Sequence, residues 1–266
     1  MAVNLRDAWA WVVIALAVVT LGWMNIQRRA EGDVFPRRAL TLICPFSAGG
    51  GTDLLARRLA YEAEQQLDRP VLVNNITGGG GAIGHAAGQL ARPDGHTLVL
   101  ATFEMVSLPI QGLAPFTYED FDLLMLLNMD PAGVAVRHDF PADSLQEFIE
   151  RAQAGETPSI GNSGSGAVWH LAAALLADRA DMPAMHVPFD GASQAITSLL
   201  GGHIDAVTVS PAELRTYIAS GQVKLLAVMS EDRLQGFPDT PTCREQGVDV
   251  VLLLFQGLSW LQSGSG

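Results

Sequence analysis

Three short glycine-rich segments stand out, because each follows an apolar run and precedes a run with helical periodicity. They are residues 47–53 (SAGGGTD), residues 78–84 (GGGGAIG) and residues 161–166 (GNSGSG). Glycine allows backbone conformations with positive φ, and it leaves backbone N–H groups uncovered by side chains. Each segment could therefore present several N–H donors to one small group.

An anion is the group that suits such donors best. The first turn of a helix has unpaired N–H groups and a partial positive charge, so it binds carboxylates and phosphates. In an open α/β sheet these turns lie at the carboxyl ends of the strands, where ligands bind. We therefore expect an anion site made of main chain. The alternative is that the glycines only make the turns tight.

Other glycine motifs fit less well. Residues 79–84 match the dinucleotide pattern Gly-x-Gly-x-x-Gly, and Glu104 is the nearest candidate for its acidic residue. This leaves an α/β enzyme with a nucleotide cofactor as the alternative function. A phosphate-binding P-loop needs Lys where this chain has His85, and residues 161–166 fail the nucleophile-elbow pattern at Ser165. No Ser–His–acid set can be assigned, so we expect no catalytic residues and no cofactor.

Strands and helices alternate around these segments. Strands are expected at residues 39–46, 70–75, 96–102, 121–128, 132–139, 159–163, 184–189, 204–210 and 223–230, and helices at residues 52–67, 81–91, 144–155, 167–180, 192–202 and 211–220. The βαβ spacing implies parallel strands joined by right-handed crossovers. We predict an α/β fold with two lobes, each a mostly parallel sheet flanked by helices. The chain is expected to cross between the lobes near residues 128–136 and 221–230.

Two of the expected helices carry clear end signals. Ser144 and Glu147 have the spacing of a capping box. Pro211 stands in a favourable first-turn position, and Gly221 follows the end of the same helix.

Composition excludes other classes of protein. The 266 residues include 28 acidic residues but only 16 Lys and Arg, which gives a net charge of −12. A nucleic-acid partner would need clustered basic residues, so we expect none. The six histidines show no ligand spacing and no Cys-x-x-Cys exists, so we expect no metal site. His170 is expected to pack or to hydrogen-bond at a helix N-terminus rather than to catalyse.

Cys44 and Cys243 could pair in an exported protein, but two buried thiols is the interpretation that we favour.

The first 30 residues form a separate segment. Residues 8–25 are apolar, Arg6 precedes them, and Arg28 and Arg29 follow. This arrangement is typical of a signal peptide or an uncleaved membrane anchor. An uncleaved anchor would also allow a third function, that of a receptor tethered beside a membrane signalling protein.

Several longer motifs resemble a known family. They are PFSAGGGTDLLARRLA, PVLVNNITGGGGAIGHAAGQLARPDGHTLVLAT, GNSGSGAVWHLAAALLA, VPFDGASQAITSLLGGHIDAVTVSPAEL and KLLAVMSEDRLQGFPDTPTCREQGVDV. In this order they resemble the Bug family, the periplasmic substrate-binding proteins of tripartite tricarboxylate transporters. The resemblance implies a non-catalytic receptor with a two-lobed Venus flytrap fold. It also implies a small di- or tricarboxylate, or a related acid, held between the lobes, and membrane permease subunits as partners.

The resemblance also assigns lobes and contacts. Residues 37–128 and 225–266 would form the first lobe, and residues 129–224 the second. The family's C-terminal helices have no counterpart after LSWLQSGSG, so the first lobe is expected to be incomplete. Asp53 is expected to cap its helix or hold water, unless the ligand carries an amino group. The expected ligand-binding residues are Ser47, Ala48, Gly49, Gly50, Thr52, Asp53, Gly78, Gly79, Gly80, Gly81 and Thr102 in the first lobe, and Asn162, Ser163, Gly164, Ser165, Gly166, His170, Asp190, Gly191 and Asp205 in the second.

Overall fold

The computed structural model describes residues 35–261, and the residues from Leu40 onward belong to one compact unit. The strands are β1 Leu40–Cys44, β2 Val71–Asn75, β3 Thr97–Thr102, β4 Phe121–Pro131, β5 Gly133–Arg137, β6 Ser159–Asn162, β7 Met185–Pro188, β8 Ala206–Val209, β9 Val223–Val228 and β10 Leu253–Leu261. The α-helices are α2 Gly51–Leu67, α3 Ala82–Gln89, α4 Glu104–Ile110, α5 Leu145–Gln153, α6 Val168–Arg179, α7 Ala192–Leu200 and α8 Pro211–Ala219. Short 3-10 turns lie at Gly79–Gly81, Tyr118–Asp120 and Arg244–Gln246.

The predicted signal or anchor, residues 1–30, lies outside the described residues. Within residues 35–261, no helix has the length and apolar composition that crossing a bilayer requires.

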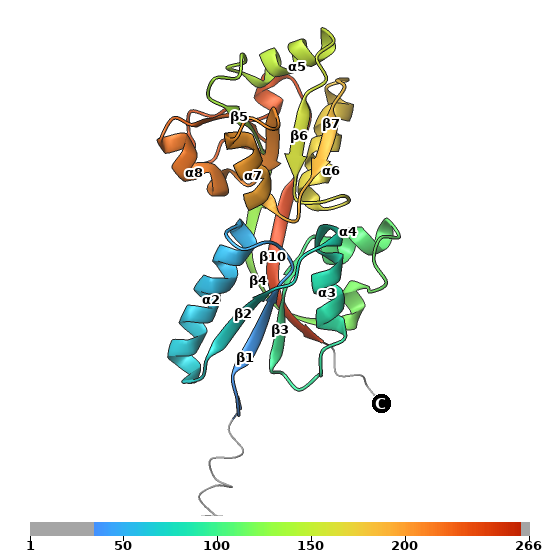
Figure 1. Ribbon diagram of the computed structural model, residues 1–266, viewed down its shortest axis with the longest axis vertical. Coiled ribbons are helices and arrows are strands. Elements are labelled where there is room, and N and C mark those ends of the chain that lie inside the picture. Colours follow the sequence, from blue (N-terminus) through green and yellow to red (C-terminus); the bar gives the residue numbers. More distant parts are fainter. Residues whose placement is uncertain (1–34, 262–266) are drawn as a thin grey trace, which may run out of the picture. The chain divides into compact units, whose positions relative to one another are not determined.

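Two five-stranded sheets organise the fold, as Figure 1 shows. The first has the order β2-β1-β3-β10-β4, and the second β7-β6-β8-β5-β9. In the first sheet β1 pairs in parallel with β2 and β3, while β10 runs antiparallel to β3 and β4. In the second, β6 pairs in parallel with β7 and β8, while β5 runs antiparallel to β8 and β9. Each sheet therefore has one reversed strand, and the predicted two-lobed α/β fold is confirmed. We call the parts built on these sheets the first and second lobes.

The reversed strands β10 and β5 are those that enter each lobe from the other one. Parallel strands in both lobes run toward the other lobe, so a strand that arrives from there must run away from it. Three residues bind the crossing chain segments together: Met229 N–H donates to Ala132 O at 2.7 Å, Ala132 N–H to Leu252 O at 3.1 Å, and Leu252 N–H to Met229 O at 2.9 Å.

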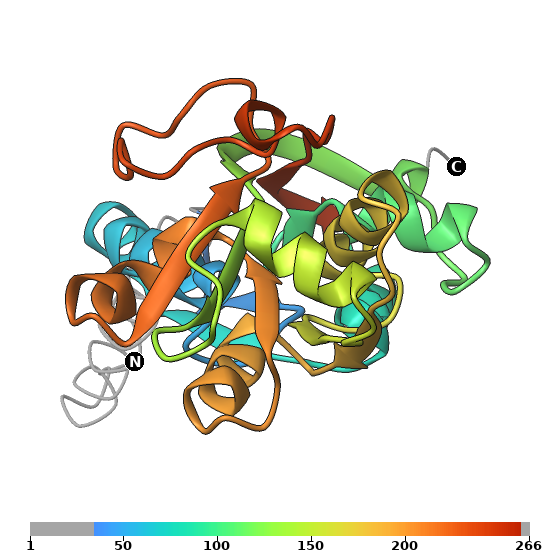
Figure 2. The same cartoon turned by 90° about the horizontal axis from the view of Figure 1, so that it is seen from above.

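The first crossing falls at Pro131–Gly133, inside the predicted range, but the second does not lie at residues 221–230. There the chain completes β9 in the second sheet and makes a long excursion, seen at the top of Figure 2. Cys243, Val248 and Val250 from this excursion pack into the second lobe's core. The return crossing therefore comes at residues 252–253, and the sheet pairing moves the boundary from 224/225 to that point.

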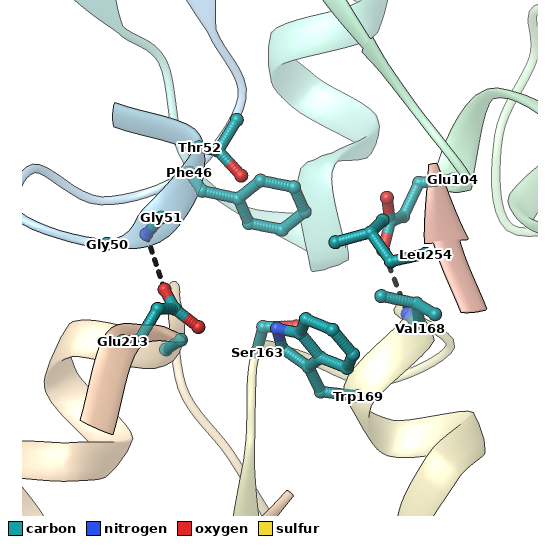
Figure 3. A pocket seen from close by; sticks show the side chains of 11 residues that line it. Phe46, Gly50, Gly51, Thr52, Glu104, Ser163, Val168, Trp169, Glu213 and Leu254 are labelled. Atoms are coloured by element: carbon teal, nitrogen blue, oxygen red, sulfur yellow. Dashed lines mark hydrogen bonds between the residues drawn. The ribbon is translucent and has the colours of Figure 1, made fainter. Parts of the chain in front are cut away.

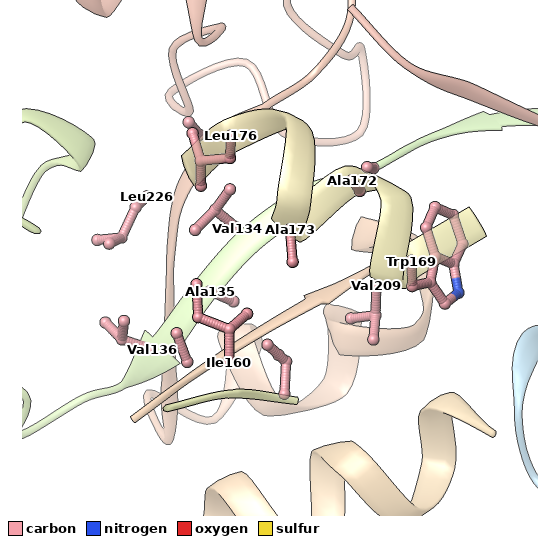
Figure 4. Packing of buried hydrophobic residues seen from close by; sticks show 14 of the residues in the cluster. Val134, Ala135, Val136, Ile160, Trp169, Ala172, Ala173, Leu176, Val209 and Leu226 are labelled. Carbon is pink, nitrogen blue, oxygen red and sulfur yellow. The ribbon is translucent and has the colours of Figure 1, made fainter. Parts of the chain in front are cut away.

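The cores of the two lobes are built differently. The second lobe has one large cluster, in which α6 lays Ala172, Ala173 and Leu176 over the sheet (Figure 4). The first lobe has two smaller clusters on opposite faces of its sheet, because side chains alternate along a strand. Leu42 and Cys44 face α2 residues such as Ala56, while Ile43 lies in the cluster of Val99 and Met105.

The two cysteines are free and buried, Cys44 in the first lobe and Cys243 in the second. The expectation of two buried thiols is confirmed. Burial raises the pKa of Cys44 to about 11 and that of Cys243 to about 12.

Candidate functional site

The loops at the carboxyl ends of the strands meet between the two lobes. The loop after β1 contacts the loop that begins α7: Ser47 N–H donates to Asp190 O at 3.3 Å, and the Ser47 and Ser193 hydroxyls are 2.9 Å apart. Ser193 Oγ also donates to Ala48 O at 3.1 Å. A Cβ atom on Gly191 would lie 2.2 Å from Ser47 Oγ and 3.0 Å from Ser47 N, so a side chain at this position would displace the Ser47 hydroxyl and crowd the loop.

The loops after β2 and β6 touch each other directly. A Cβ atom on Gly164 would lie 2.7 Å from Gly80 Cα, and one on Gly80 would lie 2.8 Å from Ser165 O. Both glycines have positive φ, +123° for Gly164 and +63° for Gly80. Side chains are therefore excluded here by close packing as well as by backbone conformation.

The N-terminus of α2 carries a carboxylate from the second lobe. Gly51 N–H donates to Glu213 Oε1, and the other Glu213 oxygen accepts from Ser210 N–H at 3.3 Å in the capping box that begins α8. Burial raises the pKa of Glu213 to about 7, and the nearby Asp130 charge adds to this, whereas the two N–H donors act to lower it. Glu213 therefore changes its charge near neutral pH.

A second glutamate makes the reciprocal contact. Glu104, at the start of α4 in the first lobe, accepts from Val168 N–H at the N-terminus of α6 at 2.8 Å. Its other oxygen accepts from the Thr102 hydroxyl. Glu104 is fully buried, and this burial raises its pKa against the two hydrogen bonds. Figure 3 shows both glutamates facing the same small cavity from different sides.

Asp53 organises the first glycine loop. Its carboxylate accepts from Gly49 N–H and Arg57 Nε through one oxygen, at 2.9 and 2.8 Å, and from Asn75 Nδ2 through the other, at 2.9 Å. Burial acts to raise the pKa of Asp53, but the donors at Arg57, Gly49 and Asn75 lower it overall. Asp53 is 2% exposed and its oxygens have partners, so it holds the loop.

Two adjoining cavities lie at this interface, and we call them together the inner hollow. The smaller has a volume of about 20 Å³, and the larger has about 280 Å³. Both are lined by Gly51, Thr52, Trp169, Glu213 and Leu254. The smaller also reaches Glu104 and Ser163, and the larger reaches Asn128 and Asp130. Among the described residues that line either cavity there is no Lys, Arg, His or Cys.

A separate outer cavity of about 490 Å³ lies where the glycine loops touch. It is lined by Gly79, Gly80, Gly164, Ser165, Asp190 and other residues. The dinucleotide alternative would place a pyrophosphate on residues 79–84. Gly84 is packed against Pro45 and Ile76, since a Cβ atom there would lie within 2.6 Å of their backbones, and Ser165 covers Gly80. Residues 79–84 therefore serve packing and lobe contact in this structure.

Many of the expected residues line one of these cavities or touch the other lobe, but several have other places. Thr102 is fully buried and holds Glu104 rather than lining a cavity. His170 Nδ1 accepts from Gly166 N–H at 3.1 Å, in agreement with the expected role at a helix N-terminus. Asp205 precedes β8 and binds Ser159 at the start of β6, so it lies at the far end of the sheet from the site. Asp205 was expected at the end of a strand, but it stands directly before the beginning of β8.

Several residues of the inner hollow were not expected from the sequence, among them Glu104 as an inter-lobe contact, Asp130, Trp169 and Glu213. For Glu213 a signal existed, because Ser210 and Glu213 have capping-box spacing around Pro211. A glutamate at that place lies at the carboxyl end of a strand, where the lobes meet. For Asp130 and Trp169 the spacing alone carries no such signal.

Comparison with known proteins agrees with this geometry. The family model described as tripartite tricarboxylate transporter family receptor matches residues 55–259. Protein BugT of Bordetella pertussis is 32% identical over 241 residues, which cover 88% of this chain and 73% of BugT.

Solved structures give the same picture. A TctC solute binding protein from Polaromonas is 41% identical with a TM-score of 0.61, and the match covers 86% of this chain and 80% of that one. MatC from Rhodopseudomonas palustris, solved with bound malate, is 27% identical with a TM-score of 0.80, over 86% of this chain and 80% of MatC.

Proposed function

Because this chain belongs to the tripartite tricarboxylate transporter receptor family, we propose that it is a periplasmic receptor holding a small organic carboxylate between its lobes. The proposed role is to deliver this acid to the membrane subunits of such a transporter. Receptors of this kind bind and release their ligand without changing it.

One observation carries the proposal. The N-termini of α2 and α6, whose first residues Gly51 and Val168 both line the smaller cavity, each hold a carboxylate in this structure, from Glu213 and Glu104. Main-chain N–H groups at a helix N-terminus therefore bind carboxylates in this interface, as their dipoles favour. Hydrogen bonds to a charged group contribute about 1.5–3 kcal/mol each. A ligand acid that reaches a few such donors can attain micromolar affinity, which is about −8 kcal/mol.

Calorimetric titration of the purified protein tests the proposal. The probes are malate, succinate, glutarate, adipate, citrate, aspartate and glutamate, and the diamide of succinic acid serves as the uncharged control. We expect saturable binding of at least one acid and none of the diamide. Absence of binding by every acid contradicts the proposal.

A matched pair of variants tests the location. Ala192 is 5% exposed and lines the smaller cavity, so Ala192→Leu should block it. Ala154 is exposed at the end of α5, so Ala154→Leu is the control. We expect the first variant to abolish binding and the second to preserve it. Equal binding by both would place the ligand outside the smaller cavity.

A further inference from the structure

We infer that the inner hollow receives a cationic nitrogen beside Asp130 and Glu213, so that the ligand is a carboxylate that also carries an amino group. This inference rests on the proposed function and narrows its ligand class. It concerns the side of the interface next to the crossing strands, away from the outer cavity at the glycine loops.

The larger cavity offers hydrogen-bond acceptors without a cation to match them. Asp130 Oδ2 accepts from Ser210 Oγ at 2.7 Å, and Glu213 accepts from Gly51 and Ser210 N–H groups, so each carboxyl keeps unused acceptor capacity. The buried Asn128 Oδ1 has no hydrogen-bond partner among the described residues. An ammonium group is the complementary partner, because it has three donors, a positive charge and no acceptor.

Ser163 gives an independent indication of a ligand. It is 3% exposed, it lines the smaller cavity, and its hydroxyl has no hydrogen-bond partner among the described residues. Buried hydroxyls are normally hydrogen-bonded, so an unpaired one that borders a cavity indicates a missing partner there. In Figure 3 Ser163 and Trp169 lie on the same side of the cavity. Trp169 borders both cavities, and an indole ring attracts cations.

The charges around the hollow favour this ligand over a plain diacid. Asp130, Glu213 and Glu104 all border it, so a ligand carboxylate beside the ionised form of any of them would meet like charge. An amino acid avoids this conflict, because its ammonium can face the acid pair while its carboxylate faces main-chain donors or Ser163. Charge-assisted hydrogen bonds of this kind are stronger than neutral ones.

The groups that face Glu213 determine the sign of the pH effect. They are Asp130 from β4, Glu104 across the smaller cavity, and the N-terminus of α2, where Asp53 is paired with Arg57. Arg215, on the same helix as Glu213, lies over Phe237 at 5.3 Å. An ammonium beside Glu213 favours its ionised form, so binding should release a proton and strengthen as pH rises. A protonated Glu213 that donates to a ligand carboxylate would give proton uptake and the opposite trend.

Matched pairs of acids test the inference by calorimetry: aspartate and succinate, glutamate and glutarate, and 2-aminoadipate and adipate. We expect an amino member to bind roughly tenfold or more tightly than its partner, as a charge-assisted contact allows. Its affinity should increase between about pH 5.5 and about pH 8, with proton release in buffers of different ionisation enthalpy. Equal or weaker binding by the amino members, or proton uptake, overturns the inference while leaving the proposed function in place.

Variants test which residues cause the preference for the amino acid over its matched diacid. Glu213→Gln and Asp130→Asn should each reduce this affinity ratio to about threefold or less. Glu150→Gln, an exposed change on α5, should preserve the ratio. Two acid variants are used so that a folding defect in one, seen by thermal melting, leaves the other informative. A preference that persists in the folded acid variants overturns the assignment. If no acid of either kind binds, the proposed function and this inference both fail.

Discussion

Glu104 and Glu213 occupy equivalent places in opposite lobes but have different surroundings. Each reaches across the interface to the first N–H of the other lobe's helix, Glu104 to α6 and Glu213 to α2. Glu104 is fully buried, with one oxygen on Val168 N–H and the other on Thr102. Glu213 is only partly buried, and it borders the larger cavity together with Asp130.

The difference separates a structural contact from a binding one. Glu104 borders only the smaller cavity, and each of its oxygens already accepts a hydrogen bond from a buried donor, so its main effect is to hold two elements together. A carboxylate with spare acceptors and a cavity beside it can also respond to a ligand. Replacing Glu104 should therefore change stability most, and replacing Glu213 should change ligand choice and pH dependence.

Removal of Glu104 should have the largest effect. Glu104→Ala leaves the Val168 N–H and the Thr102 hydroxyl without partners in a buried place, and a cavity beside them. We expect the free energy of unfolding to fall by about 3–5 kcal/mol, as when a buried polar network is broken. Urea denaturation measures this. Glu150→Ala is the control, with an expected change of about 0.5 kcal/mol or less. A similar small loss for Glu104→Ala would contradict its role as a clamp.

Replacement of Glu213 should have the next largest effect on stability, and this effect should depend on pH. Its folded pKa of about 7 lies above the ordinary glutamate value of 4.5, so the folded protein binds more protons than the unfolded one between these pH values. The wild type should therefore lose about 2–3 kcal/mol relative to Glu213→Gln as pH rises through this window. The measurement is the free energy of unfolding of both proteins by chemical denaturation at pH 4.5, 6 and 7.5. The difference between the two proteins cancels the contributions of the other titrating groups. A difference independent of pH would show that Glu213 titrates normally.

Gly164 lies in the loop that leads to Val168, the residue that Glu104 contacts, so its replacement tests how closely the two lobes pack beside that contact. Gly164→Ala places a methyl group 2.7 Å from Gly80 Cα, at a φ of +123°. Gly155→Ala is a matched control, because Gly155 has a φ of +112° and nothing within 4 Å of the added Cβ. Both variants introduce similar backbone strain, so the difference between their free energies of unfolding measures the effect of the contact between the lobes. We expect Gly164→Ala to be less stable than Gly155→Ala by about 1–2 kcal/mol in thermal or urea unfolding. Equal losses would mean that the two loops do not press together.

Much of the fold could be predicted because local patterns and global topology agree. The strand–glycine–helix units were found where expected, and the resemblance to the Bug family is confirmed by the family match. Helix α4 and strand β10 were missed. Helix α4 contains Pro109 and has only seven residues. Strand β10 reads as a plain apolar run, and its place between β3 and β4 depends on a chain crossing that no local pattern encodes.

The site was predictable where main chain makes it and unpredictable where side chains meet across the lobes. Glycine-rich turns that follow apolar strands can be recognised in the sequence. Because the strands are parallel, these turns are expected to lie at the same edge of the sheet. The pairing of Glu213 with Gly51 joins residues 162 positions apart, and its partner Asp130 arrives on a crossing strand. Asp205 was misplaced because the sequence marks a strand more clearly than it marks which end faces the cleft.

A crystal structure of the protein with the tightest-binding amino acid of the panel is the most direct test of the account. We predict that the ligand lies in the inner hollow, with its nitrogen about 3 Å from oxygens of Asp130 and Glu213. The Glu104 contact with Val168 should remain as it is here. A ligand held only in the outer cavity, or one that turns its carboxylate toward Asp130 and Glu213, would contradict it.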